Sequence, residues 1–105
     1  TMSNFENYKK RSIAIRKKYH ELEQLYHGSE WTIEEDALAF LTDAGLVGRN
    51  TMSHQKRWPK EDTQTELEHK LGECMWWLVI LAERMEIDSN KAFEKFLSKT
   101  ELMLK

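Results

Sequence analysis

The sequence has little of what interrupts or cross-links a chain. Its 105 residues include one cysteine, one proline and four glycines. With Cys74 alone, no internal disulfide is possible, which favours a reducing compartment, so we expect a cytoplasmic protein. Because proline and glycine are the residues that most often end helices, their scarcity predicts long, uninterrupted helices.

The sequence also has little net charge and no long apolar run. The formal net charge of −2 gives no general reason to expect nucleic acid or an anionic membrane as a partner. The apolar run of residues 75–82 is far too short to span a bilayer, and the polar, charged N-terminus predicts no signal peptide. A chain of this length is expected to form one domain, residues 1–105.

The first expected helix covers residues 4–26. Ser3 or Asn4 can cap it, and Gly28 can end it. Its apolar residues recur at steps of three, four and seven, which places them in one stripe that faces a partner element.

The second expected helix begins at a capping box formed by Thr32 and Glu35. Gly45 and Gly48 should allow close approach of another element and then end this helix. Residues 49–60 have no periodicity and contain the only proline, so they predict a long loop.

This expected loop is basic. It has no acidic residue and carries Arg49, His54, Lys56, Arg57 and Lys60. Contact with phosphate and simple solvation explain the pattern about equally well. The Trp76–Trp77 pair could stack on a base, but such residues more often fill a core or a dimer interface. Trp58 belongs to no apolar stripe and is therefore a better candidate than that pair for stacking on a base.

Two further helices complete an all-α, four-helix fold. The third is expected over residues 63–85 and is apolar on every side within residues 75–82, as for a central helix or one that contacts a second chain. The fourth should begin at Asp88 or Ser89. The residues expected to face inward are Ala37, Leu38, Leu41 and Ala44 of the second helix, Leu67, Leu71, Cys74, Met75, Leu78, Leu81 and Met85 of the third, and Ala92, Phe93, Phe96, Leu97 and Met103 of the fourth.

Acidic residues of the second and third helices can meet. Asp36 and Asp43 are seven residues apart, as are Glu66 and Glu73, so each pair shares a helix face. If these helices pack together, Asp43 and Glu73 can point at one another. Two such carboxylates repel unless a cation or proton lies between them, and Mg²⁺ prefers oxygen ligands of this kind. Ordinary exposed helix surface explains the spacing as well.

Two segments carry a resemblance to a known family. Thr-Asp-Ala-Gly-Leu-Val at residues 42–47 is similar to Glu-Glu-x-Gly-Glu-Leu, and Lys-Leu-Gly-Glu-Cys-Met-Trp-Trp at residues 70–77 resembles Glu-Leu-Gly-Asp-Val-Leu-Trp-Tyr. Both are motifs of the MazG-like all-α nucleoside triphosphate pyrophosphohydrolases, and the similarity covers residues 31–99. The resemblance implies a helical bundle that pairs into dimers or tetramers. It also implies Mg²⁺-dependent cleavage of nucleoside triphosphates to monophosphate and pyrophosphate.

The resemblance assigns site residues and shows departures. In the family, four carboxylates from two helices bind the metal. The two quoted motifs contain five acidic positions; Asp43 and Glu73 match one in each motif, whereas Thr42, Leu46 and Lys70 stand at the other three. The fixed positive charge of Lys70 reverses the charge at its position.

Three functions follow from these assignments. In the first, the chain is a pyrophosphohydrolase that holds one Mg²⁺ on Asp43 and Glu73, with help from Glu66 or Asp36. In the second, it binds a nucleoside triphosphate or related phosphate without hydrolysis; Lys70 replaces the metal and Arg57 assists. By the resemblance, Lys99 also contacts phosphate. In the third, it is a structural interaction protein, and Lys70 forms an ordinary ion pair.

Overall fold

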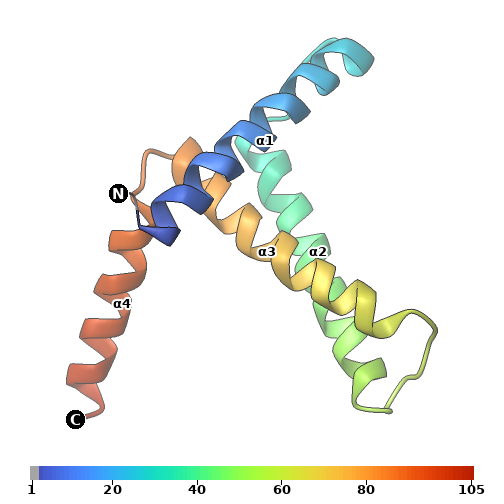
Figure 1. Cartoon of the computed structure of the whole chain (residues 1–105), viewed down its shortest axis with the longest axis vertical. Coiled ribbons are helices and arrows are strands. Elements are labelled where there is room, and N and C mark those ends of the chain that lie inside the picture. The colour runs from blue at the N-terminus through green and yellow to red at the C-terminus, as the bar shows by residue number, and fades with distance from the viewer. Residues whose placement is uncertain (1–2) are drawn as a thin grey trace. The chain divides into compact units, whose positions relative to one another are not determined.

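The computed structural model describes residues 3–105, and within that range the chain contains helices and no strand (Figure 1). The predicted all-α fold class is confirmed. The helices are α1 (Asn4–His27), α2 (Ile33–His54), α3 (Thr63–Arg84) and α4 (Ser89–Met103). None of these helices is both long and apolar enough to cross a membrane.

The described chain divides into two compact units, and the boundary between them falls within α3. One unit contains α1, the connection up to Glu30, and Val79–Lys105; the other is Trp31–Leu78. In the second unit, α2 and α3 lie side by side and are joined by the loop of residues 55–62 (Figure 1). The expectation of one domain over residues 1–105 stays a prediction, and residues 1 and 2 lie outside the described range.

The ends of α1 follow from local backbone chemistry, as predicted. The Ser3 Oγ accepts a hydrogen bond from the Glu6 amide at 3.2 Å, which satisfies one of the free N–H groups of the first turn. Gly28 adopts a left-handed conformation with φ of 74°, and its N–H donates to the Gln24 carbonyl at 3.0 Å. Gly28 ends the helix because a residue without Cβ adopts this conformation at little cost.

Capping also defines the starts of α2 and α4. The Thr32 hydroxyl accepts from the Glu35 amide at 3.1 Å, and the Glu35 carboxylate accepts from the Thr32 amide at 2.9 Å. This is the predicted capping box. Asp88 caps α4 by accepting from the Lys91 amide at 3.0 Å, and this bond holds the pKa of Asp88 below its ordinary value.

The predicted end of α2 is wrong. The helix passes through Gly45 and Gly48 and continues to His54, so Arg49 and His54 are helical and the connecting loop covers only residues 55–62. An internal glycine costs a helix only about 1 kcal/mol, which neighbouring helical turns outweigh. No atom lies within 4 Å of a Cβ added at either glycine, so neither marks a close approach.

The predicted inward positions are also largely wrong for a single chain. Among the described residues, the buried apolar side chains are Trp77 and Ile80, with 6% and 2% exposure. The periodicity correctly grouped apolar residues on helix faces, but it cannot say what covers a face. The large residues expected inside that are instead exposed are Leu38, Leu41, Leu71, Met75, Leu78, Met85, Phe93, Phe96, Leu97 and Met103.

Two glycine substitutions test how backbone conformation contributes to stability. Gly28→Ala should lower the free energy of unfolding by about 1 kcal/mol, because φ of 74° strains a residue with a Cβ. Gly72→Ala in the interior of α3 should raise it by roughly 0.5–1 kcal/mol, since an added Cβ meets no atom within 4 Å. Urea unfolding measures both changes, and equal signs for the two variants would contradict this account.

Candidate functional site

The second unit brings Asp43 of α2 and Glu73 of α3 to the same cation, the ammonium of Lys70. The Lys70 Nζ donates to Asp43 Oδ1 at 3.0 Å and to Glu73 Oε1 at 2.9 Å. Lys70 and Glu73 are three residues apart on α3, so they lie on one face about a turn apart. The two acids therefore do meet, with a lysine between them.

Trp77 fixes the second oxygen of Asp43. Its indole Nε1 donates to Asp43 Oδ2 at 2.9 Å, and the side chain is buried. Trp77 lies four residues after Glu73 and seven after Lys70, on the same face of α3. The sequence predicted that Trp76 and Trp77 fill a core or a dimer interface, or stack on a base, and this prediction missed the polar contact of Trp77. Two features could have indicated this contact: Trp77 lies on the same helix face as Lys70, and a buried indole N–H needs a hydrogen-bond acceptor.

A line of polar residues follows the contact between α2 and α3. We call this line the polar seam; it consists of Asp43, Asn50 and Ser53 on α2 and Thr63, Glu66, Lys70 and Glu73 on α3. The three α2 members are all buried. The Ser53 and Thr63 hydroxyls lie 2.7 Å apart, so the seam joins the two helices at this end as well as at Lys70.

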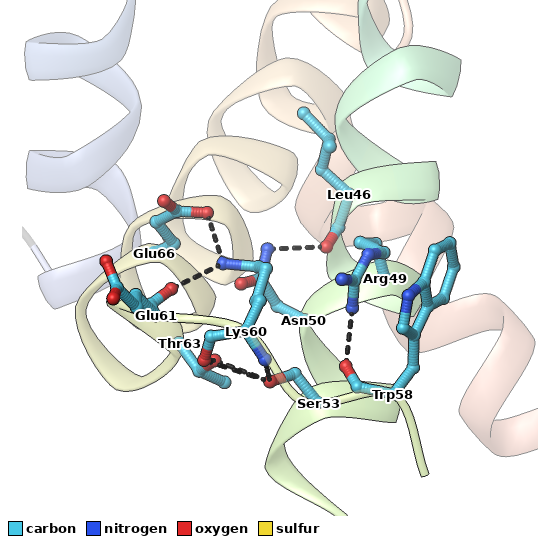
Figure 2. A network of polar contacts seen from close by, with 9 residues as sticks. All are labelled: Leu46, Arg49, Asn50, Ser53, Trp58, Lys60, Glu61, Thr63 and Glu66. Carbon is cyan, nitrogen blue, oxygen red and sulfur yellow. Dashed lines mark hydrogen bonds and ion pairs between the residues drawn. The ribbon is translucent and has the colours of Figure 1, made fainter. Parts of the chain in front are cut away.

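Figure 2 shows the end of the seam near the loop. The Lys60 amide donates to the Ser53 Oγ at 2.9 Å, and the Lys60 Nζ donates to Glu66 Oε2 at 2.7 Å. This ammonium is the main reason that the pKa of Glu66 lies below its ordinary value. The Asn50 Nδ2 donates to the Leu46 carbonyl at 2.8 Å, whereas its buried Oδ1 has no hydrogen-bond partner among residues 3–105. Glu66 is therefore already paired and is not a neighbouring free acid for a metal.

The electrostatics of the seam favour a permanently charged lysine. Hydrogen bonds from Lys70 to Glu73 and then to Asp43 raise the pKa of Lys70 above its ordinary value, so the ammonium is kept at neutral pH. Burial, followed by the nearby carboxylates Asp43 and Glu73, raises the pKa of the Cys74 thiol. A protonated, partly buried thiol is a poor nucleophile, in agreement with the absence of any sequence signal for cysteine chemistry.

The residues as arranged do not fit a Mg²⁺ centre. Mg²⁺ takes near-octahedral oxygen ligands at about 2.0–2.1 Å, whereas the two carboxylates hold an ammonium at 2.9 and 3.0 Å. Thr42 and Leu46 supply no carboxylate. Within residues 3–105, no group of three or more histidine, cysteine, aspartate or glutamate side chains is arranged to hold a metal ion.

The other predicted site residues lie elsewhere. Arg57 and Trp58 are exposed in the loop of residues 55–62. The Arg49 guanidinium lies 3.6 Å from the centre of the Trp58 ring and also donates to the Trp58 carbonyl at 2.8 Å (Figure 2), so one face of the indole is already covered. Lys99 is exposed on α4 and belongs to the other unit. The second unit therefore brings together Asp43, Lys70 and Glu73.

Comparisons with known proteins identify no relative. No family model matches the chain, and neither a curated protein nor a solved structure matches it. The MazG-like resemblance therefore rests on the motif residues of this chain.

Replacing Lys70 tests how much its ion pairs contribute to stability. Lys70→Met should lower the free energy of unfolding at pH 7 by about 2 kcal/mol, because two partly buried carboxylates lose a charged hydrogen-bond donor. Asp43→Asn is the matched partner variant. In a double-mutant cycle, the two losses should add to more than the loss in the double variant, and strict additivity would contradict the contact.

The pH dependence of the stability of wild type and Lys70→Met tests whether the charge of Lys70 causes the difference between them. A raised pKa in the folded state means that the Lys70 contribution is fully present below its unfolded pKa and disappears as the pH rises through the folded value. The stability difference between wild type and Lys70→Met should therefore be constant from about pH 6 to 9 and shrink above roughly pH 10.4. A difference that grows with alkaline pH would have the wrong sign.

Proposed function

We propose that this chain is a MazG-like relative of the nucleoside triphosphate pyrophosphohydrolases in which Lys70 has taken the place of the metal ion. Its Mg²⁺-dependent cleavage of nucleoside triphosphates is then weak or absent. One observation carries this proposal. The Lys70 ammonium is shared by Asp43 and Glu73, the two positions that match carboxylates of the family motifs.

The positive charge of Lys70 explains why the rate of metal-dependent hydrolysis should be low. Asp43 and Glu73 together carry two negative charges, and Lys70 neutralises one of them. A divalent cation must displace the ammonium or lie beside it. Two unit charges 4 Å apart repel by about 4 kcal/mol at an effective dielectric constant of about 20, and a dication doubles this cost. The lost carboxylates at Thr42 and Leu46 leave nothing to offset it.

A phosphate ligand gains little from Lys70. Its ammonium is already held by two carboxylates, so the three groups together present a net negative charge to an approaching phosphate. Arg57 and Lys99 are exposed basic residues that can contact a nucleoside triphosphate or a related phosphate without metal. Binding without turnover would therefore use Arg57 in the second unit or Lys99 in the other unit, each separately, and not Lys70.

Exposed apolar faces support a second candidate function, that of a structural interaction protein. In the second unit, polar residues are buried while large apolar residues are exposed; examples are Leu41 at 65% and Met75 at 69%. Apolar surface of this kind usually marks a protein–protein contact. We propose that these faces assemble the chain into a homodimer or tetramer, in which α2 and α3 contribute Leu38, Leu41, Leu71, Met75 and Leu78.

Restoring the family's carboxylates tests the proposed origin of the site. Wild type should release little or no pyrophosphate from nucleoside triphosphates with Mg²⁺ or Mn²⁺. The Thr42→Glu/Leu46→Glu/Lys70→Glu variant should release at least about tenfold more, since it regains three acids and so presents five carboxylates, with Asp43 and Glu73, for metal binding. Adding Asp43→Asn to this variant is the control and should abolish the gain.

Two results would contradict the proposal. Wild-type turnover of about 1 s⁻¹ or faster, within the ordinary range of enzymes, would show that Lys70 does not suppress hydrolysis. A folded triple variant without any metal-dependent release would count against a MazG-like site.

Light scattering tests the assembly. The molar mass that light scattering gives for wild type should be at least twice the chain mass of 12.6 kDa. Leu41→Glu and Met75→Glu should each lower the assembled fraction, because a buried carboxylate opposes association. Leu104→Glu, which alters an exposed apolar residue beyond α4, is the matched control. A wild-type monomer at working concentration would rule out this candidate function.

A further inference from the structure

We infer that Asp43, Glu73 and Trp77 form a cradle for an ammonium ion, and that its occupant is the chain's own Lys70. The pairing of α2 with α3 at this point then requires no metal ion. The inference rests on the premise of the proposed function that Lys70 replaces a metal ion, and it deepens that premise by stating which kind of ion the acid pair accepts.

The contact distances match an ammonium. The Lys70 Nζ lies 3.0 Å from Asp43 Oδ1 and 2.9 Å from Glu73 Oε1. Both values fall within the usual range of about 2.7–3.2 Å for an N–H···O hydrogen bond. Ca²⁺ and Mg²⁺ require oxygens at about 2.3–2.6 Å and 2.0–2.1 Å, so either ion would need the two helices or their side chains to move inward.

The cradle is rigid on the α2 side. The Trp77 indole holds Asp43 Oδ2 at 2.9 Å, and Trp77 is itself one of the most buried apolar residues described. With one oxygen held by Trp77, Asp43 presents the other to the ammonium. On the α3 side, Glu73 and Lys70 are a turn apart on one helix, so their spacing is set by the helix itself.

The Lys70 ammonium contributes charge and hydrogen bonds to the contact between Asp43 and Glu73, in addition to the packing of its side chain. Without the ammonium, Asp43 and Glu73 face each other as two carboxylates, and such a pair repels unless a cation or a proton lies between them. A small ammonium ion that restores both hydrogen bonds should therefore repair a truncated Lys70. An ion of equal charge without N–H groups should not.

Chemical rescue tests this inference. Lys70→Ala removes three carbons and the ammonium beyond Cβ, which correspond to n-propylammonium. Adding about 100 mM n-propylammonium chloride should raise the Tm of Lys70→Ala by at least about 2 °C more than tetramethylammonium chloride at the same concentration. The double variant Asp43→Asn/Lys70→Ala should show no such difference. Equal effects of the two salts on Lys70→Ala would overturn the inference.

Manganese binding to the wild type gives a second test that does not depend on folding of a variant. Electron paramagnetic resonance should detect no Mn²⁺ bound at about 1 mM, and the Tm should be the same with Mn²⁺ and with EDTA. Bound Mn²⁺ that disappears in Asp43→Asn would show that a metal displaces Lys70, and this would overturn the inference. Pyrophosphate release by the wild type without bound Mn²⁺ would contradict the proposed function alone.

Discussion

The Lys70 ammonium between Asp43 and Glu73 is the interaction on which the second unit depends most. It joins α2 to α3 at the end of the polar seam away from the loop, where Asp43 is buried and Lys70 and Glu73 are partly buried. Burial of charge is expensive unless every charge is paired and hydrogen-bonded. The ammonium and the Trp77 indole together meet that condition for Asp43. Removing the lysine would leave the buried Asp43 carboxylate and the partly buried Glu73 carboxylate without a cation between them.

The same ion pair is the basis of the proposed function. Under the proposed MazG-like relationship, Asp43 and Glu73 correspond to carboxylates of the family motifs, and the chain supplies a cation of its own between them. The cation is part of the chain and keeps its charge at neutral pH, because the two acids raise the pKa of Lys70. Large apolar residues such as Leu41 and Met75 are exposed in the second unit, and the proposed assembly would cover them.

Much of the fold was predictable because helix ends depend on local chemistry. The capping residues Ser3, Thr32 and Asp88 and the left-handed Gly28 all act within one turn of their own helix, so their roles follow from neighbouring residues. The end of α2 was not predictable in this way. Gly48 is compatible with both the interior and the end of a helix, and the helix continues through it to His54.

The sequence alone determined which residues share a helix face, including Lys70 with Glu73 on one helix and the position of Asp43 on another. It left three roles open for Lys70, because spacing along a helix contains no information about distances between helices. Tertiary structure decided that the ammonium lies within hydrogen-bonding distance of both acids, that Trp77 donates to Asp43, and that Lys60 pairs with Glu66. These contacts join residues up to 34 positions apart, which only the packing of α3 against α2 brings together.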